Sequence, residues 1–224
     1  MTDFELRERV RSATYYHLAR LLELPDAFLE AEDVFGRLVS ALEPVNPEAA
    51  GHARALAEAW VSDGRDLVRR DHLKLFVGPE HLLAPPYGSV YLDGQRELMG
   101  PSTADLVRLL AAAGLQKAET LKDAPDHVRV EFDAMHVMID RTLEAIAADD
   151  WSRAQQLIKV QATLLQNHLS RWVTPFAKLV RTGAGTAYHR HLADLLEAFV
   201  RQEYTEDAPA MVDEFHALQP AAVA

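Results

Sequence analysis

The sequence contains no cysteine, which excludes disulfides, thiolate metal sites and a cysteine nucleophile. It has no run that approaches the roughly 18 apolar residues of a membrane-spanning helix. The N-terminal stretch MTDFELRERV carries acidic side chains and no apolar core, unlike a secretory signal. These absences predict a cytoplasmic protein without stable insertion in a membrane.

Basic residues are also scarce, since 23 lysines and arginines stand against 34 aspartates and glutamates, for a formal net charge of -11. Because binding to phosphates needs a basic surface, nucleic acid is not expected as the main partner. An acidic surface instead favours a basic peptide or a cationic ligand through long-range attraction. With 224 residues, of which 49% are hydrophobic, the chain can bury a sizeable core.

Residues 78–101 resist helix formation, because eight of these 24 positions are glycine or proline. A connection of this length inside a compact helical domain tends to be functional or disordered. Disorder would leave too much apolar surface in water, including Leu82, Tyr87, Tyr91 and Met99. The segment is therefore expected to be an ordered loop that packs on the helices and presents a site. Within it, only residues 90–92 resemble a strand.

Elsewhere apolar residues recur at helical spacing, with capping residues, glycine or proline at the boundaries. The pattern predicts an all-α, single-domain helical bundle over residues 1–224. Its expected parts are N-terminal helices in 1–77, the binding loop in 78–101, C-terminal helices in 102–204 and an irregular tail in 205–224. The expected helices cover approximately residues 2–24, 25–42, 47–61, 65–77, 102–114, 125–146, 151–169 and 186–204, with at most one short turn around 211–218.

His127 and Glu131 are the first candidates for chemistry. They are four residues apart, which places both on one face of a helix, as a metal site can require. No further ligand follows at a recognisable spacing. The other interpretation is that Asp126 caps the helix, favoured there by the helix dipole, and that His127 bonds to Asp126. A helical metallohydrolase using His127 and Glu131 stays open as one alternative.

The remaining motifs do not compose a catalytic centre. The GSV sequence at 88–90 lacks the strand–turn–helix context of a nucleophile elbow, and no phosphate-binding glycine motif is present. His189 and His191 fall on different faces of a helix and are expected at a solvated surface, whereas His17 is expected in the core. The sequence therefore predicts a protein that is not an enzyme, with no catalytic residue, metal or cofactor.

A peptide-docking surface is the interpretation that remains. Leu75 and Phe76 end a helix at the mouth of the loop, Tyr87 and Tyr91 offer flat amphipathic rings, and Asp126 offers a charge. Packing of a core does not by itself call for this mixture of residues. A generic helical adaptor is the second alternative to be kept open.

Four short motifs resemble a known family. They are LFVG at 75–78, APPYGSVYL at 84–92, G-x-S-T at 100–103, and PDHV at 125–128 with EF at 131–132. In this order they resemble the TorD/DmsD/NarJ family of molybdoenzyme maturation chaperones. The resemblance runs from about residue 67 to residue 199. Gly88 and Asp93 look closest to the DmsD branch, although Tyr87 and Tyr91 stand where DmsD-like members usually have tryptophan.

This resemblance implies an all-α, non-catalytic, cytoplasmic chaperone that holds no cofactor. Its implied partners are the twin-arginine leader and the apo form of the catalytic subunit of a molybdopterin-containing oxidoreductase, of the dimethyl-sulfoxide-reductase type. It would assist cofactor insertion and delay export, as a monomer or a dimer. By position, the implied leader-binding surface comprises Leu75, Phe76, Pro86, Tyr87, Ser89, Gly100, Asp126 and His127.

Within this implied surface, each kind of residue has an expected role. Leu75, Phe76 and Tyr87 would hold the apolar segment of the leader, and Asp126 would receive an arginine. Proline at position 86 would hold the shape of the loop, and glycine at position 100 would let the backbone approach closely.

Overall fold

The computed structural model describes residues 2–78, 82–94 and 98–218, which are helical nearly throughout. This confirms the all-α prediction for the described part of the chain, where β-type pairing is limited to one isolated bridge. The first half contains α1 (Asp3–Leu21), α2 (Phe28–Ala31), α3 (Val34–Leu42), α4 (Pro47–Asp63), α5 (Arg65–His72), the π-helical segment η1 (Leu73–Val77), α6 (Gly88–Leu92) and α7 (Pro101–Ala112). The second half contains α8 (Val128–Ala147), α9 (Trp151–Leu164), η2 (Leu165–Leu169), α10 (Ser170–Gly183), α11 (Ala187–Gln202), η3 (Glu203–Asp207) and α12 (Ala208–Leu218).

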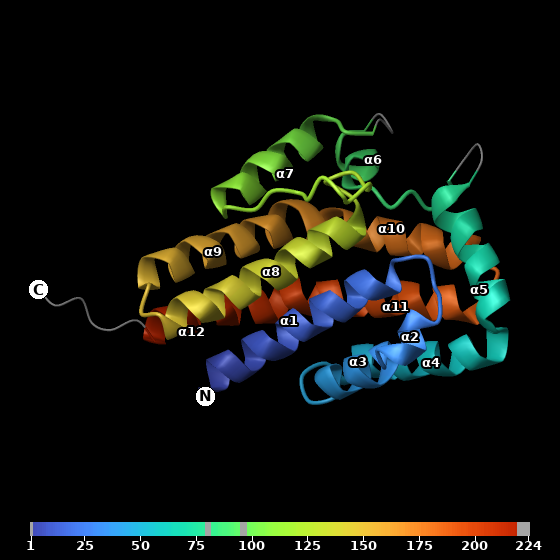
Figure 1. Cartoon of the computed structure of the whole chain (residues 1–224), viewed down its shortest axis with the longest axis horizontal. Helices are drawn as coiled ribbons and strands as arrows, with labels where there is room; N and C mark the ends of the chain where they lie inside the picture. Colours follow the sequence, from blue (N-terminus) through green and yellow to red (C-terminus); the bar gives the residue numbers. More distant parts are fainter. Residues whose placement is uncertain (1, 79–81, 95–97, 219–224) are drawn as a thin grey trace, which may run out of the picture.

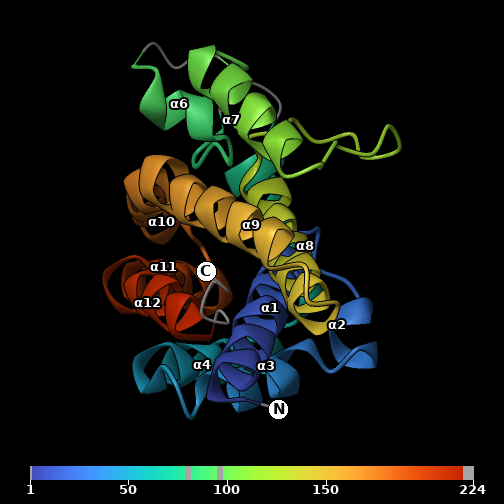
Figure 2. The same cartoon turned by 90° about the vertical axis from the view of Figure 1, so that its left-hand side faces the viewer.

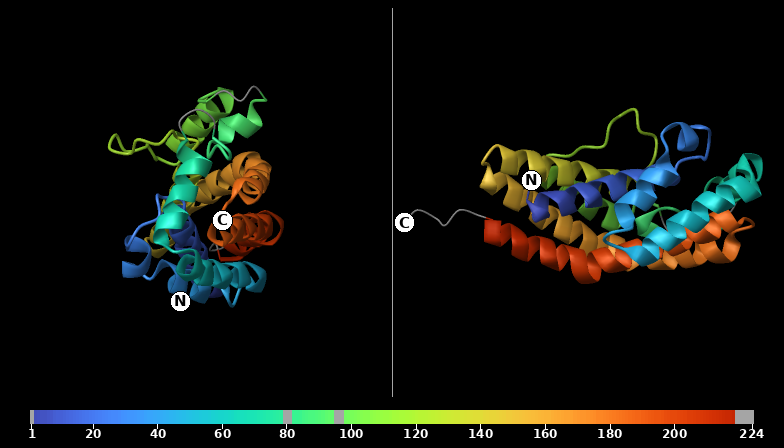
Figure 3. Two further views of the ribbon diagram at one scale, coloured as in Figure 1. Left: turned by 90° about the vertical axis from the view of Figure 1, so that its right-hand side faces the viewer. Right: turned by 90° about the horizontal axis from the view of Figure 1, so that it is seen from below.

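The long helices form a bundle in stacked layers (Figures 1 and 2). Helix α1 packs against α8 and α3, and α4 packs against α11 and α3. Helix α10 covers α11, and α9 covers α8. The short α6 and α7 lie at one edge, on α10 and α9 respectively, while α5 closes one end of the bundle (Figure 1). Seen from below, the bundle is elongated, with α12 at the end opposite α5 (Figure 3).

The main hydrophobic core draws residues from both sides of the loop. It is assembled by the apolar face of each long helix, from Tyr15 on α1 to Phe132 on α8 and Trp172 on α10, all fully buried. A second cluster lies where α12 meets α1 and α9. It consists of Phe4, Ala145, Ala154, Ile158, Met211 and Phe215.

Local capping explains several helix starts that the sequence predicts. Thr2 and Glu5 form a capping box at α1, with the Glu5 amide 3.2 Å from Thr2 Oγ1. Asn46 caps α4, whose first residue is Pro47. Asp150 caps α9, as its position before a tryptophan suggests. These contacts are local in sequence, so they can be predicted without the fold.

Other boundaries differ from the prediction. Residues 25–42 form two helices because Asp33 is left-handed, with a φ of 49°, between α2 and α3. Residues 90–92 belong to α6 and are not a strand. Helix α8 begins at Val128 and not near Pro125, because the backbone just before it pairs with the loop. In the predicted ordered loop, residues 79–81 and 95–97 lie outside the described residues.

The predicted irregular tail is also wrong over residues 205–218. Segment η3 and helix α12 continue to Leu218, because Met211 and Phe215 are four residues apart and bury the same helix face. Their partners, among them Phe4 and Ile158, come from distant parts of the chain. Residues 219–224 lie outside the described part.

His189 does not lie at a solvated surface, as predicted, but is fully buried. Its Nδ1 is 3.1 Å from Asp71 Oδ2, and the Thr186 hydroxyl and the Gly185 amide donate to the same carboxylate. Burial favours the neutral acid, but hydrogen bonds from His189, Thr186 and Gly185 hold the pKa of Asp71 well below its usual range. Asp71 thus ties α5 to the start of α11. His17 is buried, as predicted.

Candidate functional site

The loop is fastened to the start of α8 by backbone hydrogen bonds. The Gly88 amide donates to the Asp126 carbonyl at 2.8 Å, and the Val128 amide donates to the Pro86 carbonyl at 2.9 Å. Between them, Tyr87 and His127 form an antiparallel bridge, and their rings meet edge to face with centroids 5.3 Å apart. Two of the motifs that carry the family resemblance are therefore in direct contact, although about 40 residues separate them in the sequence.

A hollow of about 420 Å³ opens beside this bridge. Four of the eight predicted leader-binding residues line it, namely Phe76, Pro86, Tyr87 and His127. The lining combines apolar with charged side chains. The full lining comprises Leu22, Glu23, Leu24, His72, Phe76, Val77, Leu82, Pro86, Tyr87, Asp123, His127 and Arg129.

The other four predicted residues support the site without lining the hollow. Leu75 and Ser89 are fully buried, and Asp126 is 1% exposed. The Asp126 carboxylate accepts a hydrogen bond from the Ser89 amide at 2.9 Å, which places its charge at the start of α6. Gly100 is half-buried next to Asp93, where a side chain would collide with the Asp93 carboxylate. In this structure, the Asp126 carboxylate is therefore not accessible to an arginine from outside the chain.

Three charged residues of the hollow were not among the predicted site residues. Arg129 on α8 donates to Asp123 from Nε at 3.2 Å and approaches Glu23 Oε1 with Nη1 at 3.3 Å. Burial opposes ionisation of Asp123, but the hydrogen bonds from Arg129 lower its pKa below the usual value. Glu23, Asp123 and Arg129 come from separate segments, so no motif in the sequence groups them.

The two histidines of the hollow are neutral at neutral pH. Burial lowers the pKa of His127 to about 4 and that of His72 to about 3. His127 is the N-cap of α8, with its Nδ1 accepting from the Arg129 amide at 3.1 Å. The prediction that Asp126 caps this helix is therefore wrong. With both imidazoles neutral, the charged lining residues Glu23, Asp123 and Arg129 sum to one negative charge, and Arg20 outside the lining pairs with Glu23 at 2.7 Å.

Glu131 lies under the loop and not in the hollow. It is fully buried, and burial together with the nearby Asp126 charge raises its pKa well above the usual value, which favours the neutral acid. A Cβ at position 88 would come within 3.1 Å of both Glu131 Oε1 and Trp172 Nε1. Glycine at position 88 is thus required for the close approach of α6 to α8 and α10.

The metal-site alternative finds little support in this arrangement. Among the described residues, three histidine or acidic side chains close enough to share a metal ion occur at His52, His191 and Asp194, on α4 and α11, and not at His127 and Glu131. His127 and Glu131 also differ in environment, since one lines the hollow and the other is enclosed beneath the loop. The hydrolase alternative is accordingly not favoured.

A second, more apolar groove has a volume of about 630 Å³. Its lining residues come from α7, from α8, from the connection between these two helices and from α1. The lining residues are Tyr16, Val107, Leu110, Ala111, Leu115, Gln116, Lys117, Ala118, Leu121, Pro125, Val130, Asp133, Ala134, His136 and Val137.

Within the described residues, no helix is both long enough and apolar enough to cross a membrane.

The chain is similar in sequence to known chaperone proteins. The chain is 28% identical over 211 residues to the chaperone protein TorD of Aeromonas salmonicida, covering 91% of this chain and 94% of that one. It is 26% identical over 206 residues to the Tat proofreading chaperone DmsD of Salmonella typhimurium, covering 89% and 88%. A match to TorD of Vibrio parahaemolyticus, 28% identical over 131 residues, spans 58% of this chain and only 60% of that relative.

A solved structure shares the fold. A putative redox enzyme maturation protein from Archaeoglobus fulgidus superposes with a TM-score of 0.52 at 17% identity, over 87% of this chain and 93% of that one. These relatives are named as chaperones or maturation proteins and not as enzymes, in agreement with the sequence. The family described as nitrate reductase delta subunit matches residues 42–178, more than half of the chain. The chain therefore belongs to this family, which includes TorD-like and DmsD-like chaperones, as its motifs indicate.

Proposed function

We propose that the chain is a cytoplasmic chaperone that binds the twin-arginine leader and the apo catalytic subunit of a molybdopterin-containing oxidoreductase. In this role it assists cofactor insertion and delays export until the subunit is complete. The observation that carries the proposal is the hollow beside the Tyr87–His127 bridge, whose lining combines apolar side chains with two carboxylates and one guanidinium. A twin-arginine leader offers the complementary pair, two cations followed by an apolar segment.

The eight leader-site residues divide into two roles in this proposal. Phe76, Pro86, Tyr87 and His127 contact the leader, because they line the hollow. The other four, Leu75, Ser89, Gly100 and Asp126, hold the loop and α6 in place from beneath. The apolar groove between α7 and α8 is the seat proposed for the apolar segment of the leader, since residues that precede and begin α8 contribute to the lining of both the groove and the hollow.

A client of the dimethyl-sulfoxide-reductase type remains part of the proposal. The identities to TorD and DmsD, 28% and 26%, do not separate the two branches. The DmsD-like feature is Gly88, and an acidic side chain at this position would meet Glu131 and Trp172 at close range. Packing around α6 therefore gives a physical reason for glycine in this chain.

Replacement of Tyr87 by alanine tests the contact role. We expect Tyr87→Ala to weaken binding of synthetic twin-arginine leader peptides about 10-fold, because the loss of a half-buried aromatic contact at a binding site costs about 1–2 kcal/mol. Isothermal titration calorimetry measures the change. Tyr204→Ala is the matched control, because Tyr204 is 46% exposed on η3 and does not line the hollow.

The outcomes separate the proposal from the alternatives. Failure of the wild-type protein to bind any leader from a molybdoenzyme precursor would contradict leader recognition. Full maturation of the client in cells with Tyr87→Ala would favour a generic helical adaptor that needs no leader pocket. Metal in stoichiometric amount in the purified protein would reopen the hydrolase alternative.

A further inference from the structure

An arginine of the leader needs a carboxylate that is accessible from the hollow. Asp126 does not meet this need, because it does not line the hollow and its carboxylate accepts the Ser89 amide beneath the loop. Glu23 and Asp123 do meet it: both line the hollow, with side chains 27% and 34% exposed. Glu23 follows the end of α1 and Asp123 precedes α8, so the fold brings them together from opposite ends of two long helices.

A guanidinium already lies between these two carboxylates. Arg129 donates to Asp123 Oδ2 from both Nε and Nη2, and its Nη1 is 3.3 Å from Glu23 Oε1. The same Nη1 lies 3.9 Å from Asp133 Oδ2 on the next turn of α8. The chain thus shows that this part of the hollow has the geometry and charge to accept a guanidinium. Arg129 itself is only 16% exposed.

An independent feature of the same hollow indicates a donor from outside the chain. His72 lines the hollow and is 4% exposed, and its Nδ1 has no hydrogen-bond partner among the described residues. A buried polar atom without a partner is costly, and native structures usually satisfy such groups. Burial lowers the pKa of His72 to about 3, so the ring is neutral at neutral pH and one of its nitrogens can accept an N–H.

We propose that Glu23, Asp123 and His72 form the acceptor site for an arginine of the leader, and that Arg129 is a resident guanidinium which the leader displaces from its carboxylates. The inference deepens the proposed function and rests on it. In the empty state, Arg129 neutralises Asp123 and, together with Arg20, whose Nη1 is 2.7 Å from Glu23 Oε1, it neutralises Glu23. On binding, the leader arginine takes over these bonds and adds the bond to His72. Exchange of one guanidinium for another keeps the charge of the site balanced.

Lysine cannot replace arginine at such a site. The planar guanidinium presents several N–H groups at once to two carboxylates and an imidazole, whereas an ammonium is a point charge. Wild-type protein is therefore expected to prefer an Arg-Arg leader over the same peptide with Lys-Lys by about 10-fold or more. Removal of the two carboxylate charges should abolish this preference.

The experiment measures binding of one synthetic molybdoenzyme leader peptide in Arg-Arg and Lys-Lys forms. In the Glu23→Gln/Asp123→Asn double variant, the preference should fall to about 2-fold or less. In Arg129→Gln, affinity for the Arg-Arg peptide should rise about 3- to 10-fold, because the internal competitor is gone. Glu48→Gln is the control for charge, since Glu48 pairs with Arg201 outside the hollow. Circular dichroism establishes that each variant is folded.

A second readout follows Arg129 directly. The ¹⁵N–¹H signal of Arg129 Nε, assigned by its absence in Arg129→Gln, should shift with the Arg-Arg peptide and not with the Lys-Lys peptide. If wild-type protein binds neither peptide, the proposed function and this inference both fail. If it binds but the double variant keeps the 10-fold preference, or if Arg129→Gln weakens binding, the acceptor site is wrong while leader binding stands.

Discussion

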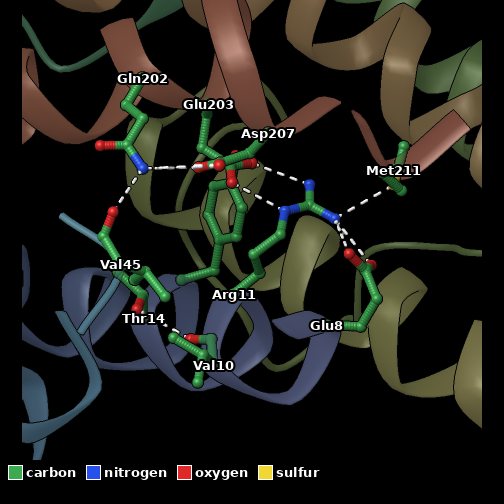
Figure 4. Close-up of polar contacts among 10 residues, drawn as sticks. Glu8, Val10, Arg11, Thr14, Val45, Gln202, Glu203, Asp207 and Met211 are labelled. Atoms are coloured by element: carbon green, nitrogen blue, oxygen red, sulfur yellow. Dashed lines mark hydrogen bonds and ion pairs between the residues drawn. The ribbon is translucent and has the colours of Figure 1, made fainter. Parts of the chain in front are cut away.

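Arg11 on α1 is a buried cation, 4% exposed, held by two glutamates (Figure 4). Its Nε and Nη2 donate to Glu203 at 2.7 and 2.8 Å, and its Nη1 donates to both oxygens of Glu8 at 2.7 Å. Tyr15 adds a hydrogen bond to Glu203 at 2.8 Å. Two carboxylates on one guanidinium leave an excess negative charge in a buried place. Burial, opposed by Arg11, raises the pKa of Glu8 above its usual value.

The excess negative charge affects the pKa of Asp207, which can be tested through the stability of the protein. Burial and the charge of Glu203 raise its pKa from 3.8 to about 6, so the folded protein holds this proton more tightly than the unfolded chain. Its contribution to the free energy of unfolding is therefore present below pH 4 and is lost as the pH rises through about 6. We expect Asp207→Asn to stabilise the protein by about 1–2 kcal/mol at neutral pH and to have a smaller effect at acidic pH.

Urea unfolding at about pH 7.5 and about pH 4.5 checks the Asp207 prediction. Asp213→Asn is the control, because Asp213 is an exposed acid on α12 that changes the net charge equally. An equal gain from both variants would show that only the overall charge matters. A loss of stability in Asp207→Asn at neutral pH would contradict the assigned role of burial.

At the scale of elements, the π-helical segments change the direction in which side chains leave the helix, compared with a regular α-helix. A π-helical turn contains an extra residue and rotates the faces that follow it. Segment η1 buries Leu75 completely while Phe76 lines the hollow, and η3 carries Glu203 beneath Arg11. Each follows directly on an α-helix, and the hydrophobic periodicity of that helix does not predict the change to a π-helical turn. Such segments often accompany functional sites, and η1 adjoins the proposed leader site.

The groove between α7 and α8 can be tested by one charge on its wall. We expect Val137→Glu to weaken binding of the leader peptide about 10-fold or more, because a carboxylate would face the apolar segment of the leader. A truncated peptide that keeps the two arginines but lacks the apolar segment should bind both proteins equally. Val61→Glu is the matched control, since Val61 is 80% exposed on α4 and outside the groove. Equal binding of the complete peptide by both variants would remove the groove from the site.

At the scale of the whole molecule, α12 lies at one end of the bundle, away from α5 and from the start of α8 (Figures 1 and 3). The cluster ties α12 to α1 and α9, with Phe215 6.4 Å from Phe4 and 6.1 Å from Trp151 between ring centroids. The hollow is built from the end of α1, from η1, from the loop and from the start of α8. Stability and recognition are therefore served by separate regions.

This separation makes a prediction about Phe215, which is fully buried. Phe215→Ala should lower the free energy of unfolding by about 3 kcal/mol, through lost burial and the cavity left behind. Affinity for the leader, measured at low temperature where the variant is folded, should change less than about 2-fold, since distant sites rarely couple. Chemical unfolding and calorimetry give the two values. A large loss of affinity in folded protein would show that α12 is coupled to the leader site.

The sequence by itself determined the features that depend on near neighbours. The 3.6-residue periodicity and the caps at Thr2, Asn46 and Asp150 specify helices through contacts within a few residues. The glycines and prolines of residues 78–101 mark the interruption, and the motifs around it identify the family. Four members of the hollow, Phe76, Pro86, Tyr87 and His127, are within reach of this reasoning because they belong to those motifs.

Only the tertiary structure decided which charges face the hollow. Glu23 meets Asp123 and Arg129 there, although it is separated from Arg129 by 106 positions in the sequence. The same packing turned Asp126 inward and buried His189, which the local pattern places at a surface. Tail residues 208–218 became a helix because distant apolar partners cover Met211 and Phe215. Burial and charge pairing depend on contacts between distant segments, and these contacts are absent from any short stretch of sequence.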